Sequence, residues 1–396
     1  MMKSYSEYLI EAKTHLEHAE EFILNSGKAG LALAVKQMRG TIKQLSGHSK
    51  SAVNITVKYD GAPAIFFGID PADGKYFVGT KTIFNKEPVL IKSPSDAPAG
   101  ELGEKLSAAI EHFPKLGLKR GMILGDLMFT ASSLKTATIE SKAYLTFKPN
   151  TILYAVPAET PLAATMKAAK IGIVWHTQFA GDSIASMKPL AGKPISQGLR
   201  QHKDVWHDDV KIKDLSGTAT MTTELTAELL AELNAIEKNA AQISDDLITR
   251  VATNNSTVAL IKKFINQNVR AAKPIEADEK FVADLRTFLA SQFPSDGKSI
   301  ETRAPAKVLF DHSNAEIKKL FHVIALIVDV KLKIIKHLDR LTSLGTFVET
   351  KNGLEVVGHE GFVISDRLGK NMMKLVDRME FSRYNFSPDT IKGFSK

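Results

Sequence analysis

Residues 53–68, VNITVKYDGAPAIFFG, begin with the alternation of apolar and polar side chains that is typical of a β-strand. Because successive side chains of a strand point to opposite faces, Lys58 and Asp60 are expected on one polar face. Gly61 follows at once and lets a backbone or a ligand approach closely. We expect the apolar residues 64–67 to form the return strand of a hairpin. A lysine in this setting is a candidate nucleophile.

Four segments of the chain carry a resemblance to a known family. Residues 58–61, KYDG, resemble the K-x-D-G signature of the covalent nucleotidyltransferases, the superfamily of polynucleotide ligases and messenger-RNA capping enzymes. Residues 123–129, ILGDLMF, resemble the third motif of that family, and residues 360–363, EGFV, are similar to the fourth. Residues 373–375, MKL, stand where the lysine-bearing fifth motif belongs. The family order of the four segments makes the resemblance more specific than any one of them.

The resemblance implies a role for each matching residue. Lys58 and Lys374 would be the catalytic residues. The residues expected to bind the nucleotide are Asp60, Gly61, Lys81, Asp126, Tyr154 and Glu360. The residues expected to hold a metal ion are Asp60, Asp126 and Glu360. Lys81 comes from GTKT, similar to the small motif after the nucleophile, and the ring of Tyr154 in LYAV would stack on adenine.

The implied chemistry fits these residue types. A lysine amine has a pKa near 10.4, so attack on phosphorus at neutral pH requires that pKa to fall through burial or neighbouring positive charge. Attack by Lys58 on the α-phosphate of ATP would give a lysyl-AMP and release pyrophosphate. Lys374 and a Mg²⁺ or Mn²⁺ ion held by carboxylates would neutralise the phosphoryl charge. AMP would then pass to a 5′-phosphate end, and a 3′-hydroxyl would seal the strand.

Two positions depart from the family pattern. Asp126 stands where glutamate is usual and is one methylene shorter, and Val376 stands where a second lysine is frequent, with Lys370 as a substitute. These departures favour an alternative from another class, a catalytically silent module for nucleic-acid binding or virion assembly. A further alternative is the same transfer chemistry with nicked DNA or a protein as the acceptor.

The charge balance indicates a polyanionic partner. The chain has 52 Lys and Arg against 44 Asp and Glu, a net charge of +8, and no cysteine, which excludes disulfides and thiolate zinc sites. Residues 1–24 carry acids throughout and lack the apolar block of a signal peptide, so no export is expected. Residues 320–328, the most apolar later stretch, are far shorter than the ~20 residues of a membrane span. We therefore expect a cytoplasmic protein with no membrane partner.

The N-terminal segment, residues 1–48, is predicted to be a helical hairpin packed on the catalytic domain, with a break at Ser26-Gly27. Lys36, Arg39 and Lys43 fall on one side of its second helix, where a solvated face is favoured over nucleic-acid contact.

The first part of the nucleotidyltransferase domain is predicted over residues 49–214. Strands dominate to about residue 156, interrupted by a helix over residues 101–113, and a short helix and another strand follow over residues 159–174. Residues 181–214 are rich in Gly, Ser, Pro and charge and are interpreted as a boundary. The segment QHKDVWHDD within it suggests a metal site, but a surface loop is favoured.

A helical insertion is predicted over residues 215–345, because apolar stripes at helical spacing recur there and a final long helix covers about residues 314–344. Its basic residues are Lys262, Lys263, Arg270, Lys273, Lys318, Lys319, Lys331, Lys333, Lys336 and Arg340. They suit a clamp on nucleic-acid phosphates, but an insertion for packing or dimerisation with solvated lysines is an equal alternative. The oligomeric state is open.

Residues 346–396 are predicted to be the second part of the nucleotidyltransferase domain, with a hairpin turn at Lys351-Asn352-Gly353. The resemblance as a whole implies an α+β fold with an antiparallel-sheet, ATP-grasp-like ligase domain. Residues 379–396 are too few for the OB-type domain that DNA ligases and capping enzymes place there, which favours RNA over DNA as the substrate. The compact motif set is similar to the RNA ligases of tailed bacteriophages, which implies RNA repair in the host cytoplasm.

Overall fold

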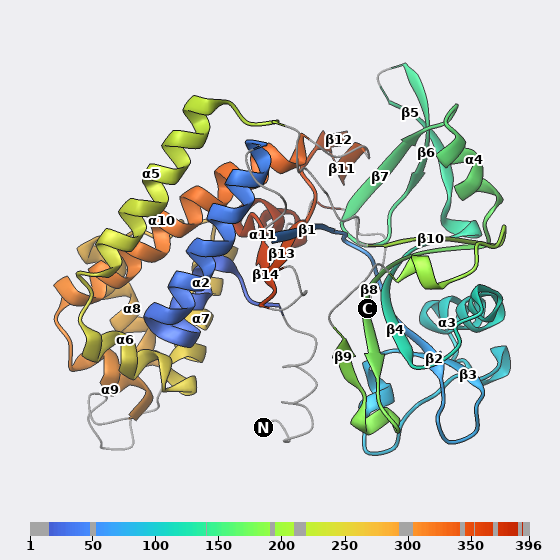
Figure 1. Cartoon of the computed structure of the whole chain (residues 1–396), viewed down its shortest axis with the longest axis horizontal. Helices are drawn as coiled ribbons and strands as arrows, with labels where there is room; N and C mark the ends of the chain where they lie inside the picture. Colours follow the sequence, from blue (N-terminus) through green and yellow to red (C-terminus); the bar gives the residue numbers. More distant parts are fainter. Residues whose placement is uncertain are drawn as a thin grey trace.

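The structure is a computed structural model of the whole chain (Figure 1). It describes residues 16–47, 53–139, 141–190, 195–209, 219–292, 304–340, 345–351, 353–366, 371–386 and 390. The mixed α+β class is confirmed, with helices and largely antiparallel sheets in one chain. Within the described residues, no helix combines the length and the apolar character needed to span a membrane.

The smallest sheet joins segments that are distant in sequence. Its strands, in spatial order, are β1 (Val53–Lys58), β13 (Gly361–Asp366) and β14 (Met373–Leu375), and both pairings are antiparallel. Ile55 and Val57 are buried on one face of β1, whereas Thr56 and Lys58 on the other face are only half-buried. The predicted alternation of this strand is therefore confirmed. In Figure 1 the sheet lies between the helices on the left and the larger sheets on the right.

The hairpin predicted over residues 53–68 is wrong. β2 (Ala64–Ile69) pairs with β3 (Tyr76–Gly79) and β4 (Met122–Thr130), while β1 pairs with β13. Between β1 and β2 the chain crosses from one sheet to another, where Ala62 N–H donates to Leu127 O at 3.0 Å. Leu127 N–H donates in turn to Pro63 O at 3.0 Å. The alternation specified the buried face of β1 but not its partner strand.

A six-stranded sheet carries the third motif. Its order is β10 (Val205–Asp209), β8 (Ile171–Ala180), β4, β2 and β3, with β9 (Lys188–Leu190) paired to β8. The predicted helix over residues 101–113 is confirmed as α3 (Glu101–His112). A core of buried side chains that includes Phe67, Phe113 and Trp175 unites α3 with one face of this sheet.

The surface-loop interpretation of QHKDVWHDD is wrong, because this segment contains β10. β10 pairs in parallel with β8, and the side chains of His207 and Asp209 are buried. Asp209 accepts hydrogen bonds from the Ile195 and Ser196 amides at 2.7 and 3.0 Å. These bonds hold residues 195–196, which belong to the expected boundary segment 181–214, against β10 of the sheet.

A five-stranded antiparallel sheet has the order β12 (Gly353–Val356), β11 (Gly345–Thr350), β7 (Ile152–Pro157), β6 (Lys142–Phe147) and β5 (Lys135–Ile139). The expected short helix after β7 is α4 (Pro161–Ala168). Thr350 pairs with Gly353 across the turn from β11 to β12, so the predicted hairpin is confirmed; Asn352 lies outside the described residues.

The segment predicted as helical contains α5 (Thr223–Ala240), α6 (Asp245–Ala252), α7 (Asn255–Arg270), α8 (Glu279–Ser291), α9 (Ala304–Phe310) and α10 (Asn314–Asp339). Their helical character is confirmed, and α10 ends earlier than expected. The short α11 (Arg378–Phe386) follows β14 and packs against α7.

The N-terminal helix α2 (Phe22–Leu45) lies between these helices and the smallest sheet. It packs on α5 and α6 and also contacts β1 and β13. The predicted break is present as a kink with non-helical backbone at Ser26 and Gly27. Residues 1–15, most of the first helix of the predicted hairpin, lie outside the described residues. One continuous apolar core joins α2, the smallest sheet, part of the five-stranded sheet and the insertion helices.

Candidate active site

Lys58 and Glu360 meet where β1 pairs with β13. Lys58 is the last residue of β1 and lies opposite Gly361, and Glu360 comes immediately before that glycine. Lys58 Nζ forms an ion pair with Glu360 Oε1, and the two side chains are 29% and 14% exposed. Two of the predicted motifs are thus in direct contact.

Gly361 makes this arrangement possible. Its φ angle is +151°, and a Cβ atom at this position would lie 2.1 Å from the carbonyl oxygen of Leu375 in β14. No side chain fits there without moving β13 away from β14. The glycine after Glu360 is therefore required by the close approach of the two strands.

The electrostatics of the pair are set by burial and by neighbouring carboxylates. Burial lowers the pKa of Lys58, but the charges of Glu360, Asp126 and Asp60 outweigh burial, and the net pKa lies above its ordinary value. Burial raises the pKa of Glu360 to about 7, against the opposing effect of the Lys58 charge. Lys58 is therefore a protonated ammonium in this state, and Glu360 is a carboxylate that can take up a proton near neutral pH.

Asp126 in β4 supplies a second half-exposed carboxylate near Lys58. It lies opposite Ala64 of β2, and a Cβ atom at Gly61 would be 2.5 Å from the Asp126 Cβ. Gly61 thus lets the chain after β1 pass directly over β4. The Asp126 side chain is 27% exposed, and its Oδ2 lies 3.7 Å from Nε2 of His176.

His176 was not predicted from the sequence. The register between β4 and β8 shifts at this point, so that His176 is the extra residue of a β-bulge and its ring reaches Asp126. Its Nδ1 lies 2.8 Å from the Thr177 hydroxyl. The only sequence signal is a polar residue that interrupts the apolar strand IGIVWHTQFA.

Asp60 has a structural role that differs from the prediction. Its side chain is 3% exposed, and its two oxygens accept hydrogen bonds at 2.8 Å from Asn150 Nδ2 and from the amides of Thr151 and Ile152. These donors belong to the turn between β6 and β7. Both oxygens hold this turn against the end of β1, while the metal-ligand and nucleotide-binding roles of Asp60 stay predictions.

The predicted stacking of the Tyr154 ring on adenine does not fit its position. It is fully buried, its ring stacks on Phe147 with centroids 5.4 Å apart, and its hydroxyl accepts a hydrogen bond from the Asp60 amide at 2.8 Å. A buried ring offers no open face to adenine. The Tyr154 hydroxyl instead holds the backbone of Asp60 in place through this hydrogen bond. Burial raises the pKa of the Tyr154 hydroxyl well above the ordinary value.

Lys374 lies on the same sheet face as Lys58. Val363 pairs with both Thr56 and Lys374, and directly opposed side chains project to the same side of a sheet. Burial lowers the pKa of Lys374, and the charge of Lys58 lowers it further although Glu21 opposes this. Among the described residues the Lys374 ammonium forms no ion pair, so it is available to an anion.

Lys81 and the metal ligands are the remaining predicted parts of the site. Lys81 begins the 3₁₀ helix η2 (Lys81–Phe84), where its side chain is exposed, and the charges with the largest effect on Lys58 are Glu360, Asp126 and Asp60. In the part of the chain that the structure describes, no three His, Asp or Glu side chains are grouped to hold a metal ion. Asp126 is the one predicted ligand with a half-exposed carboxylate that is not in an ion pair with lysine.

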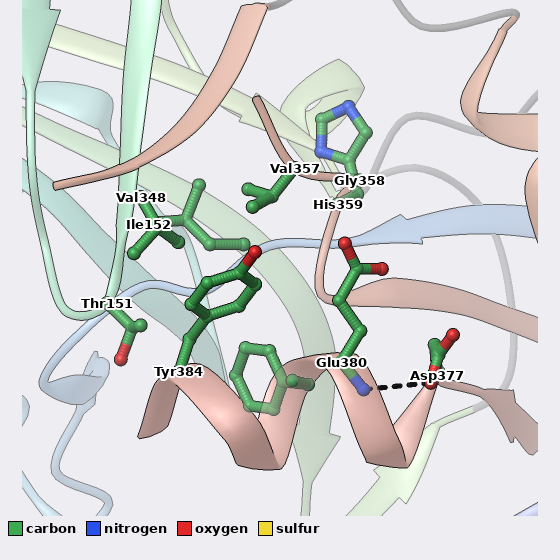
Figure 2. Close-up of a pocket in the computed structure, with 10 residues that line it drawn as sticks. Thr151, Ile152, Val348, Val357, Gly358, His359, Asp377, Glu380 and Tyr384 are labelled. Carbon is green, nitrogen blue, oxygen red and sulfur yellow. Dashed lines mark hydrogen bonds between the residues drawn. The ribbon is translucent and has the colours of Figure 1, made fainter. Parts of the chain in front are cut away.

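The hollow beside His359 is too small for a nucleotide. Figure 2 shows its walls, where the Tyr384 side chain extends from α11 toward Ile152, and His359 precedes Glu360 in the chain. Its volume of about 20 Å³ is room for a water molecule. A second hollow of about 420 Å³, lined by Lys119, Arg120 and Gln178 among others, includes none of the predicted site residues.

The basic residues of the insertion do not form one free cationic surface. Ion pairs with glutamates engage four of them: Lys262 with Glu17, Lys318 with Glu279, Lys331 with Glu20, and Lys333 with Glu228 and Glu232. Lys263 donates to Gln292 at 2.5 Å. Each of these five lysines has a partner within the chain, and the phosphate-clamp prediction stays a prediction.

Comparison with known proteins gives one match. Residues 13–390 match the model of a family of unknown function, DUF6267. Neither the curated proteins nor the solved structures include a match to the chain.

Proposed function

This chain belongs to DUF6267, a family of unknown function, and we propose that it is an ATP-dependent polynucleotide ligase that works through a lysyl-AMP on Lys58. The observation that carries the proposal is that four side chains from different parts of the chain come together. They are Lys58 at the end of β1, Glu360 just before β13, Asp126 in β4 and Lys374 in β14. A nucleophile, a proton acceptor and groups for phosphate charge are the components that nucleotidyl transfer requires.

In the first step the Lys58 nitrogen would attack the α-phosphorus of ATP. An N–P bond forms, the bond from the α-phosphorus to the bridging oxygen breaks, and pyrophosphate leaves with the electron pair. Before the attack, one proton of the Lys58 ammonium would pass to Glu360, which it already contacts and whose pKa of about 7 suits a base at neutral pH. The second proton that the nitrogen loses as the N–P bond forms would leave with pyrophosphate or pass to solvent. Positive charge beside Lys58, from Lys374 or from a bound divalent cation, would lower its raised pKa, whereas the phosphates by themselves would raise it further.

Lys374 would bind the phosphoryl oxygens that gain charge during the transfer. Its position on the same face as Lys58, and the lack of an ion-pair partner among the described residues, support this role. Asp126 would hold a divalent cation, since Mg²⁺ is commonly bound by one or two carboxylates together with substrate phosphates. Such an ion, when bound, supplies further charge neutralisation at the phosphates.

The acceptor would be a 5′-phosphate end, and RNA is the preferred polymer. The preference rests on the resemblance of the four motifs to phage RNA ligases, which also implies reaction in the host cytoplasm. A nicked DNA or a protein acceptor would use the same first step, so a panel of acceptors decides between them.

A catalytically silent binding module is a second candidate. The raised pKa of Lys58 and its ion pair with Glu360 favour it, because a protonated lysine is not a nucleophile. The two candidates differ in one product, the Lys58 adenylate.

The test is incubation of the protein with α-labelled ATP and Mg²⁺ or Mn²⁺, with pyrophosphatase added, followed by intact mass and peptide mapping. Wild type is expected to gain one AMP on Lys58, and Lys58→Ala is expected to gain none. Lys148→Ala is the matched control, because Lys148 is also a strand-end lysine paired with a glutamate, Glu349, at 2.9 Å. No adduct in wild type with ATP, GTP or NAD would overturn the ligase proposal and favour the binding module.

A further inference from the structure

The strand that carries Lys374 is bordered by the N-terminal segment. The Lys374 amide donates to the Glu17 carbonyl at 2.9 Å, and His18 forms a parallel bridge with Lys374. Residues 17–18 thus extend the smallest sheet beyond β14. The position of this segment therefore fixes the outer edge of the strand on which Lys374 lies.

The insertion holds this segment at two points. Lys262 of α7 contacts the Glu17 carboxylate at 2.6 Å and Glu21 at 3.4 Å. Lys331 of α10 contacts both oxygens of Glu20 at 3.1 and 3.0 Å. Helices from the middle of the chain are thereby attached to the segment that borders β14.

A third cation, from the chain just after β14, pairs with the same glutamates. Arg378, which begins α11 shortly after β14, lies 3.3 Å from Glu20 and 3.1 Å from Glu21, and it also bonds Asn266 of α7. The side chains of Glu20 and Lys331 are each 1% exposed. A buried ion pair of this kind is costly to break, so the segment has one defined position.

The two carboxyls nearest Lys374 are unlike each other in charge. Burial raises the pKa of Glu17, but hydrogen bonds from Glu21 and Lys262 lower it to a net value of about 2. Burial and the hydrogen bond with Glu17 raise the pKa of Glu21 to about 7. Near neutral pH Glu17 thus carries the steady negative charge to which Lys262 is bound.

We propose that Glu17 and Lys262 are positioning residues for Lys374, so that the helical insertion fixes the lysine that binds the transferred phosphoryl group. The inference rests on the proposed function, because it assigns a purpose to the placement of Lys374. It also explains why Lys262, a candidate phosphate contact by sequence, faces into the molecule. The insertion then serves nucleotidyl transfer, in addition to any contact it makes with the polymer.

The experiment compares Lys262→Met with Lys333→Met. Both remove one lysine charge from an insertion helix, but among the described residues the ion-pair partners of Lys333 are Glu228 and Glu232 of α5. Lys262→Met is expected to slow Lys58 adenylation roughly tenfold or more, since small misplacements of a catalytic group are expensive. Lys333→Met is expected to match wild type, and Lys262→Arg is expected to restore most of the rate because arginine can also pair with Glu17.

A double-mutant cycle separates positioning from general loss of stability. In a Lys374→Ala background, Lys262→Met is expected to add less than about a twofold effect, because the group that it positions is already absent. A full tenfold effect in that background would overturn the proposal. So would an adenylation rate for Lys262→Met equal to that of Lys333→Met.

Hydrogen exchange at the Lys374 amide provides a readout that is independent of activity. This amide donates to Glu17, so Lys262→Met is expected to accelerate its exchange at least about tenfold, and Lys333→Met is expected to leave it unchanged. Unchanged exchange in Lys262→Met would overturn the coupling. If wild type forms no adenylate while exchange still depends on Lys262, the proposed function fails and the coupling of the insertion to β14 stands.

Discussion

The ammonium of Lys58 and the carboxylate of Glu360 form an ion pair at the end of the ladder between β1 and β13. Antiparallel pairing with Gly361 brings the two residues together from opposite parts of the chain. The proton of the pair resides on Lys58, whose pKa is raised, and the pKa of Glu360 is about 7. The following predictions test the charges and the backbone contacts that maintain this site.

Replacing Glu360 with glutamine is expected to lower the pKa of Lys58. Burial lowers that pKa, and the negative charge of Glu360 is the largest of the effects that raise it. Without that charge the lowering by burial is opposed less strongly, so the pKa of Lys58 falls. The measurement is an NMR pH titration of ¹³C-methylated lysines. Glu349→Gln, which removes the partner of Lys148, is the control, and an unchanged Lys58 titration in Glu360→Gln would contradict the prediction.

Replacing Asp126 with asparagine is expected to reduce Lys58 adenylation by roughly 10²-fold through loss of charge stabilisation at the phosphates. The fold should persist, because the Asp126 carboxylate is half-buried and its Oδ2 lies 3.7 Å from His176 Nε2, too far for a hydrogen bond. Adduct formation and thermal unfolding are measured together. Asp284→Asn, at a surface carboxylate paired with Lys280, is the matched control, and equal rates in the two variants would refute a catalytic Asp126.

Replacing Asp60 with asparagine is expected to lower the free energy of unfolding by about 2–3 kcal/mol. An amide has one oxygen where the carboxylate has two, so at least one of the donors from Asn150, Thr151 and Ile152 loses its partner. Urea unfolding gives the value. Asp73→Asn, at an exposed carboxylate, should change stability far less, and an equally small change at Asp60 would disprove its structural role.

Replacing Gly361 with alanine is expected to lower the free energy of unfolding by about 1–3 kcal/mol through overpacking and backbone strain. The new methyl group would lie 2.1 Å from the Leu375 carbonyl oxygen. Gly198→Ala is the control, since a Cβ atom there meets nothing within 4 Å. Equal stability of the two variants, measured by urea unfolding, would show that β13 and β14 can separate without cost.

Replacing Glu17 with glutamine is expected to change the pH dependence of stability. The folded-state pKa of about 2 lies below the ordinary 4.5, so the stabilisation by this carboxylate is complete above about pH 4.5 and is lost as the pH falls toward 2. Glu17→Gln should therefore be less stable than wild type at neutral pH, by roughly 1–2 kcal/mol after solvent screening of this partly exposed group. In urea titrations the difference should shrink below pH 4.5, and a constant difference would count against the assignment.

The sequence by itself determined which side chains are buried within most elements. The alternation in residues 53–58 specified the two faces of β1, and helical periodicity located α3 and the insertion helices. These features are local, because the period of a strand or helix is set by its own backbone geometry. The grouping of Lys58, Asp126, Glu360 and Lys374 came instead from the resemblance of their motifs to the nucleotidyltransferases, and in the structure these residues lie near one another.

Only the tertiary structure decided which partner each element meets. β1 pairs with β13 rather than β2, Asp60 holds the β6–β7 turn, and a bulge in β8 brings His176 to Asp126. Lys262 and Lys331, basic residues on amphipathic helices, turn inward because Glu17 and Glu20 lie opposite them in the folded chain. A periodic pattern encodes a buried face but not the surface that covers it. That choice depends on long-range packing and on the pairing of charges that water no longer solvates.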